Sequence, residues 1–114
     1  MIEEKEIRWM GSSYDDLLTF PDEPRRYAGY QLAKIQAGQD PENWKPFDDV
    51  GAGTREIRIR DGHGIYRVLY VAKFEEAVYV LHCFVKKSQV TAKCDKDIAE
   101  ARYRAVVNVR KAKR

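Results

Sequence analysis

Six polar side chains between residues 54 and 87 have the types and the spacing to act on a phosphodiester. They are four cations, a carboxylate and an imidazole: Arg58, Arg60, Arg67, Lys86, Glu56 and His82. Guanidinium groups bind phosphate through paired hydrogen bonds, so a set of cations of this kind indicates an anionic ligand. Any one arginine could simply pair with Glu56, but one carboxylate is too few for all four cations.

Cleavage of RNA without a metal needs three groups. A base takes the proton from the 2′-hydroxyl, a cation stabilises the charge on the phosphorane, and an acid protonates the leaving 5′-oxygen. The sequence offers a candidate for each role. The base could be Glu56 or His82, and Arg67 with Arg58 could hold the charge. The acid could be Lys86 or Lys87. His82 could equally be a hydrogen-bonded residue of a sheet, and the two lysines could be no more than a soluble strand end.

No metal site or cofactor is predicted. The two histidines are far apart and the two cysteines form no CxxC pair, so no metal-ligand spacing is present. Unpaired Cys83 and Cys94 suit a reducing cytoplasm. Gly51 and Gly53 lack the GxGxxG or GKS/GKT pattern of a phosphate-binding loop and are expected only to permit unusual backbone angles.

A three-stranded antiparallel meander is predicted to position the polar set. Three β-rich runs are separated by polar breaks at residues 61–64 and 75–76. These turns place Arg58 opposite Arg67, Arg60 opposite Ile65, and Leu69 opposite His82. Like charges directly opposite each other destabilise a sheet, so the facing arginines favour a bridging anion.

Alternation along the three strands predicts two different faces. One is a core wall of Ile57, Ile59, Tyr66, Val68, Tyr70, Phe74, Tyr79, Leu81, Cys83 and Val85. The other carries the polar set among Ile65, Leu69, Val71, Val78, Val80 and Phe84. We expect the polar face to form an open surface.

The rest of the chain is predicted to complete a single α+β domain over residues 1–114. An opening strand at residues 3–10 precedes two short helices, one from Ser12 or Ser13 to Pro21 and one from Asp22 to about Gly38, which we expect to cover the core wall. Residues 38–46 are predicted to be a loop in which Trp44 packs as a plug. A last helix begins near Asp95 and is expected to pack through Ile98, Ala101, Ala105, Val109 and Ala112.

Charge is distributed unevenly along this chain. Residues 1–50 hold 6 Lys/Arg against 11 Asp/Glu, whereas residues 51–114 hold 15 against 7, which gives +8 for the second part. A basic portion of this kind favours an anionic partner such as nucleic acid, although a solvated Lys/Arg tail is an equal alternative. The first ten residues are too acidic for a signal peptide and no run is long enough to cross a membrane, so we expect a cytoplasmic protein without a membrane partner.

The segments GTREIRIRDGHGIYRVLYVAKF and VYVLHCFVKKSQ, with an IAEAR helix start after them, resemble the RelE/HigB toxin superfamily, and most closely its phage-derived HigB-like branch. The similarity extends over about Val50 to Arg102, and the order of strand, two helices and meander also agrees. It implies a toxin of a type II toxin–antitoxin pair, an mRNA interferase that enters the ribosomal A site and cuts mRNA there. Its partner would be a helix-turn-helix antitoxin.

By this resemblance, the arginine of the YR pair and a basic residue after the last strand belong to the active site, which here means Arg67 and Lys86 or Lys87. Further RNA contacts are predicted at Arg58, Arg60, Lys93 and Arg102. The chain departs from the RelE pattern in two ways. SQVTAKC has no tyrosine, and the second basic position is lysine, a point charge rather than a planar fork. The roles of Lys86, Lys87 and His82 are therefore left open.

Two other functions fit the same scaffold. A ParE-like toxin inhibits DNA gyrase by binding and needs no catalytic row on its sheet. An interaction module would use the basic half of the chain only to dock an acidic partner, and the effect of its substitutions would follow the charge removed.

Overall fold

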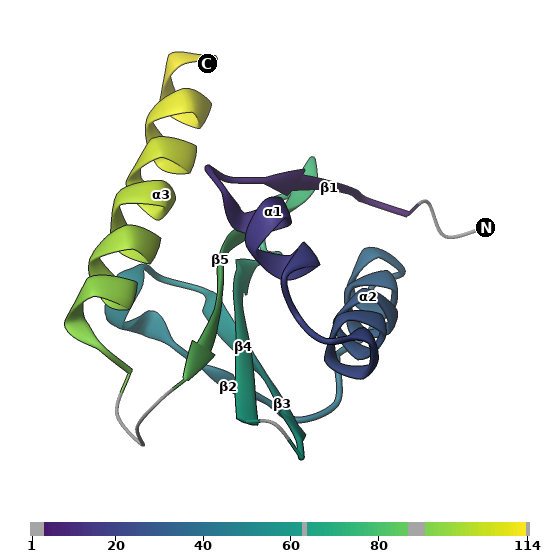
Figure 1. Ribbon diagram of the computed structural model, residues 1–114. Helices are drawn as coiled ribbons and strands as arrows, with labels where there is room; N and C mark the ends of the chain where they lie inside the picture. The colour runs from purple at the N-terminus through teal and green to yellow at the C-terminus, as the bar shows by residue number, and fades with distance from the viewer. Residues whose placement is uncertain (1–3, 63, 87–90, 114) are drawn as a thin grey trace.

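The computed structural model of the chain describes residues 4–62, 64–86 and 91–113 (Figure 1). In chain order the elements are β1 (Glu6–Trp9), α1 (Ser13–Leu18), α2 (Asp22–Gln36), β2 (Trp44–Pro46), the 3-10 helix η1 (Asp48–Val50), β3 (Thr54–Asp61), β4 (Gly64–Val71), β5 (Ala77–Lys86) and α3 (Lys93–Ala112). The predicted α+β class is confirmed. None of the helices in these ranges is long and apolar enough to span a membrane.

The strands form one sheet in the order β1-β5-β4-β3-β2. Strands β3, β4 and β5 are the predicted meander, and β1 adds to β5 in parallel. Strand β2 was not predicted, because residues 38–46 were assigned to a loop. Its three residues pair with Arg55–Ile57 of β3. Trp44 is only partly buried, and its ring carries the Arg55 guanidinium 4.0 Å from the ring centroid, so it is not a buried plug.

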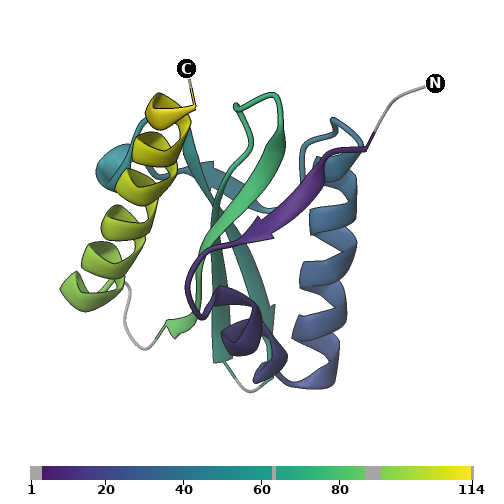
Figure 2. The same cartoon turned by 90° about the horizontal axis from the view of Figure 1, so that it is seen from above.

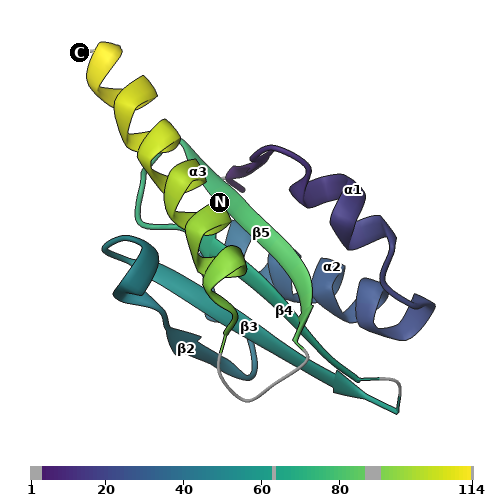
Figure 3. The same cartoon turned by 60° about the vertical axis from the view of Figure 1, so that its left-hand side comes forward.

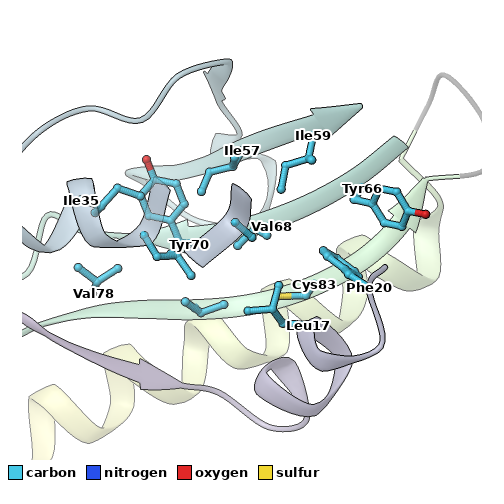
Figure 4. Packing of buried hydrophobic residues seen from close by; sticks show 13 residues of the cluster. Leu17, Phe20, Ile35, Ile57, Ile59, Tyr66, Val68, Tyr70, Val78 and Cys83 are labelled. Atoms are coloured by element: carbon cyan, nitrogen blue, oxygen red, sulfur yellow. The ribbon is translucent and has the colours of Figure 1, made fainter. Parts of the chain in front are cut away.

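Helices α1 and α2 cover one face of the sheet, as predicted (Figure 2). Leu17, Phe20 and Ile35 pack there against a wall that includes Tyr70 (Figure 4). The helices begin and end where the sequence indicates, with Pro24 in the first turn of α2 and Gly38 just beyond its end at φ +83°. This face is the larger apolar core and fixes the orientation of the meander strands.

A β-bulge in β5 changes which side chains lie on each face. Leu69 faces His82 as predicted, but the next pair is Tyr70 with Val80, so Leu81 is the extra residue. Beyond this point the alternation is inverted. Val78 and Val80 join the α1–α2 face, whereas Tyr79 and Leu81 lie on the other, so the predicted positions of these four residues were wrong. Two further predicted members of the core wall also differ, because Phe74 packs on the opposite cluster and Val85 is 42% exposed.

Helix α3 packs on the second face, which we call the α3 face (Figures 2 and 3). Ala99 and Val106 are its buried residues, and they contact a cluster of Leu69, Val71, Tyr79, Leu81 and Phe84. The predicted packing stripe was wrong, since Ile98 and Val109 are 38% and 51% exposed. The expectation of an open polar face was therefore only half correct, because α3 covers its apolar part.

Candidate functional site

Pairing between strands brings most of the predicted polar set together on the α3 face. Arg58 lies directly opposite Arg67, as predicted, and Arg60 lies opposite Ile65. Ile65 in turn faces Lys86 on β5. Glu56 precedes Arg58 by two residues on β3 and therefore lies on the same face, and its cross-strand partner on β2 is Lys45. We call these six side chains the Arg67 cluster: Lys45, Glu56, Arg58, Arg60, Arg67 and Lys86.

A buried ion pair lies at the centre of the Arg67 cluster. Arg67 Nε is 3.2 Å from Glu56 Oε1, and the two side chains are 3% and 0% exposed. Burial lowers the pKa of Arg67, Glu56 opposes that shift, and Arg58 and Arg60 add to it. Two buried charges of opposite sign are tolerated because each compensates the other, and removal of either leaves an uncompensated charge.

Lys45 is a member of the cluster that the sequence reasoning missed. Its Nζ lies 3.7 Å from the same Glu56 oxygen, and its side chain is 43% exposed. The residue was overlooked because it was assigned to a loop. The one feature that could have indicated its position was the short run Trp44–Pro46, which pairs with β3 so that Lys45 faces Glu56.

The hydrogen bonding of the central pair is incomplete. Among the described residues, Glu56 Oε1 and Oε2 and Arg67 Nε are buried without a hydrogen-bond partner. Buried polar atoms are usually bonded, and exceptions are concentrated at sites with a chemical role. The pair is therefore held by charge, with no hydrogen bond at these three atoms among the described residues.

The pKa of Lys86 lies below that of a free lysine. Burial lowers the pKa of Lys86, Arg67 lowers it further, and Lys45 and Arg58 add to the effect against the opposing influence of Glu56. A lysine whose pKa is lowered toward the working pH transfers a proton more readily than a free lysine does. This property suits the predicted role as an acid.

Arg58 and Arg60 form the exposed rim of the cluster. Within the described residues, Arg58 has no carboxylate at ion-pair distance, although it stands beside the positive charge of Arg67. An exposed guanidinium with no partner is available to an anion from solution. Together with Lys45 and Lys86, these arginines surround the buried pair with positive charge.

His82 is positioned by α3 and lies apart from the cluster. Its Nε2 is 2.7 Å from Oδ1 of Asp95, in the first turn of α3, and its ring stacks on Phe84. Leu69 separates it from Glu56 along the row of paired strands. Its Nδ1 is buried and has no partner in the described part of the chain. The geometry favours the alternative of a hydrogen-bonded sheet residue, and a catalytic role for His82 stays a prediction.

The remaining predicted residues are not brought into the cluster. Lys93 pairs with Asp97 on the exposed side of α3, and the Arg102 guanidinium donates to Leu81 O at 2.9 Å and to Ser12 Oγ at 3.1 Å. Arg102 therefore ties α3 to the sheet and to α1. Lys87 and His63 lie outside the described residues. In the ranges that the structure covers, no three His, Cys, Asp or Glu side chains could jointly hold a metal ion.

Comparison with known proteins assigns the chain to a family. A comparison with curated proteins gives no match. The model of the family described as phage-derived protein Gp49-like (DUF891) matches residues 15–104, which is about four fifths of the chain. This match covers most of α1, all of α2, the whole meander and most of α3, including every residue of the Arg67 cluster. The chain therefore belongs to the phage-derived Gp49-like family, a family of RelE-like toxins.

Proposed function

We propose that this protein is the toxin of a type II toxin–antitoxin system and acts as a ribosome-dependent mRNA endoribonuclease. The observation that carries the proposal is the Arg67 cluster, in which a buried carboxylate–guanidinium pair is surrounded by Lys45, Arg58 and Lys86. Membership of a RelE-like family supports the toxin assignment. The HigB-like branch, the ribosomal A site and a helix-turn-helix antitoxin are parts of the same proposal.

The chemistry begins with phosphate binding. The RNA backbone contacts the exposed Arg58 and Arg60, and one phosphate then replaces Glu56 as the partner of Arg67. Because Arg67 and Glu56 are almost fully buried, this exchange requires the side chains around them to move aside. The lack of hydrogen bonds between the pair makes such an exchange less costly.

Release of Glu56 from Arg67 supplies the base. The carboxylate takes the 2′-hydroxyl proton, the 2′-oxygen attacks phosphorus, and Arg67 stabilises the charge on the phosphorane. The bond to the 5′-oxygen breaks, and Lys86 protonates that oxygen. The products are a 2′,3′-cyclic phosphate and a 5′-hydroxyl, and no metal takes part in this scheme.

Translation in a cell-free extract tests the proposal, with primer extension on the mRNA. The inactive variant is Glu56→Leu/Arg67→Met, which replaces both buried charges by apolar groups of similar size and so leaves neither uncompensated. The control is Arg25→Gln/Arg26→Gln, which changes two arginines of α2 that pair with Asp22, the first partly buried and the second exposed. We expect ribosome-dependent cuts with wild type and control and none with the inactive variant.

The burial of Arg67 favours one alternative, a toxin that acts by binding alone. Such a protein would arrest growth without cutting mRNA, and a ParE-like action on gyrase would produce a DNA-damage response. Intact mRNA in the extract, combined with growth arrest by the same protein, would replace the nuclease proposal with this one.

A further inference from the structure

A groove of about 740 Å³ lies at the end of α3 remote from the Arg67 cluster. It runs between the second half of α3 and the connection from β4 to β5, which are joined by the ion pair between Arg110 and Glu76. Phe74, Tyr79, Tyr103 and Val107 supply its apolar lining. Val109 borders the groove and is 51% exposed, which extends the apolar strip along the helix.

The groove walls are fixed in place by polar contacts. Arg110 Nη1 donates to both carboxylate oxygens of Glu76, at 2.6 and 2.7 Å, and Tyr79 donates to Glu76 at 2.7 Å. The Tyr103 hydroxyl donates to Ala52 O at 2.7 Å. Side chains that are already ordered lose little conformational entropy when a ligand binds, so this groove is preorganised.

Positive charge dominates the groove rim. Five cations line it against one carboxylate, Glu76, which is already paired. Among the described residues, Lys73, Lys111 and Lys113 have no carboxylate within ion-pair distance, and all three are exposed. Basic residues at a helix C-terminus suit the helix dipole. That explanation does not extend to Lys73, which precedes β5 and comes from a different part of the chain.

Two of the three aromatic rings of the groove, Phe74 and Tyr79, carry cations over their faces, and the third, Tyr103, packs one face against Gly51. The Arg110 guanidinium lies 4.1 Å from the Phe74 ring centroid and Lys73 Nζ lies 5.2 Å from it, while Arg8 lies over the Tyr79 ring. Single-stranded RNA is bound through aromatic faces on which bases stack. Aliphatic side chains can instead fill an apolar channel between rings that are already covered. The groove therefore fits a protein ligand better than RNA.

We propose that this groove binds an acidic amphipathic helix of a partner protein. Its apolar residues contact Phe74, Tyr103 and Val107, and its carboxylates pair with Lys73, Lys111 and Lys113. From Tyr103 to Lys113 the α3 wall is about 15 Å long at ~1.5 Å per residue, which matches about three turns of a ligand helix. The inference goes beyond the proposed function and does not depend on it, because the groove and the Arg67 cluster lie at opposite ends of α3.

Titration of the ¹⁵N-labelled full chain with designed peptides tests the inference. The probe is a 14-residue helical peptide with leucines at i, i+3, i+4 and i+7 and glutamates on its other positions. A scrambled peptide of identical composition, which spreads the leucines around the helix, is the first control. We expect saturable binding at least tenfold tighter than that of the scrambled peptide, with amide shifts confined to residues 73–79 and 103–113.

Matched protein variants complete the test. Lys111→Gln/Lys113→Gln should weaken binding of the amphipathic peptide at least fivefold, whereas Arg25→Gln/Arg26→Gln removes the same number of charges from α2 and should leave it unchanged. Equal binding of both peptides, equal effects of both variants, or shifts at residues 56–67 would overturn the inference. So would a single-stranded RNA oligonucleotide that displaces the peptide from the groove. Cleavage of mRNA is measured in a separate experiment, so none of these outcomes bears on the proposed nuclease function.

Discussion

The two halves of the α3 face are built from the same strands but differ in what they can bind. One half carries Leu69, Leu81 and Phe84 and is covered by α3. The other half carries Lys45, Arg58 and Lys86 around a buried ion pair and has exposed cations at its rim. The apolar half obtains its stability within the chain, whereas the charged half has more cations than carboxylates. This excess of positive charge supports the proposal that the charged half binds an anionic ligand.

The largest effect is expected from breaking the buried pair. Arg67→Ala leaves the buried Glu56 carboxylate with only the half-exposed Lys45 at 3.7 Å as its partner, which should lower the free energy of unfolding by about 3 kcal/mol. Urea unfolding measures this loss. The double variant Glu56→Leu/Arg67→Met should recover most of the stability, and a double variant as unstable as Arg67→Ala would show that packing, and not charge, holds the site.

The apolar half should respond to truncation in a different way. Leu69 is fully buried between its cross-strand partners Glu56 and His82, so Leu69→Ala should cost about 2–5 kcal/mol through lost burial and a residual cavity. Because no charge changes, RNA binding by the folded fraction should stay at the wild-type level. Binding that falls in proportion to the Leu69→Ala truncation would mean that the two halves are not independent.

A smaller effect is expected at the hydrogen bond that joins Asp95 of α3 to His82 of β5. Asp95→Ala leaves Nε2 of buried His82 without its partner, so the free energy of unfolding should drop by about 1–3 kcal/mol. Asp97→Ala is the matched control, since its exposed pair with Lys93 should contribute less than about 1 kcal/mol. We expect cleavage per folded molecule to be unchanged in both variants. A selective loss of cleavage in Asp95→Ala would instead support His82 as a base.

The smallest expected effect is a difference in pKa between Lys86 and Lys93, which NMR titration of the two side chains would measure. The pKa of Lys86 is lowered, chiefly by burial and by Arg67, while the pKa of Lys93 is raised by its pairing with Asp97. Lys86 should therefore lose its proton at lower pH than Lys93 does. Because its folded pKa lies below the unfolded value, the penalty that Lys86 places on folding is present at neutral pH and is relieved as pH rises through the folded pKa. The reverse order of titration would contradict this account of the charged half.

The sequence was sufficient for the fold and for most of the charged half. Alternation along β3 and β4, with a turn at residues 61–64, correctly paired Arg58 with Arg67, because short antiparallel connections leave little freedom of register. Alternation failed in β5, where the bulge at Leu81 moved Tyr79 and Leu81 to the α3 face. A bulge is set by how neighbouring strands and helices pack, and residue types in one strand do not reveal it.

Errors in α3 and at Lys45 have related causes. The predicted packing stripe counted only apolar residues, whereas α3 also packs through Arg102 and Tyr103, long side chains with polar ends that bond to Leu81 and Ala52. Lys45 was missed because a strand of three residues has too short a pattern to detect. The partners of His82 could not be predicted either, since Asp95 reaches it only through the placement of α3.

The salt dependence of single-stranded RNA binding tests the central claim most directly. Each phosphate contact contributes about 0.7 to the slope of log K against log salt concentration for single strands. Arg58→Gln/Arg60→Gln should therefore reduce the slope by about 1.4, while Arg25→Gln/Arg26→Gln, which removes the same charge from α2, should leave it unchanged. An equal reduction for the two variants would show that RNA responds only to net charge and would contradict a binding site on the charged half of the α3 face.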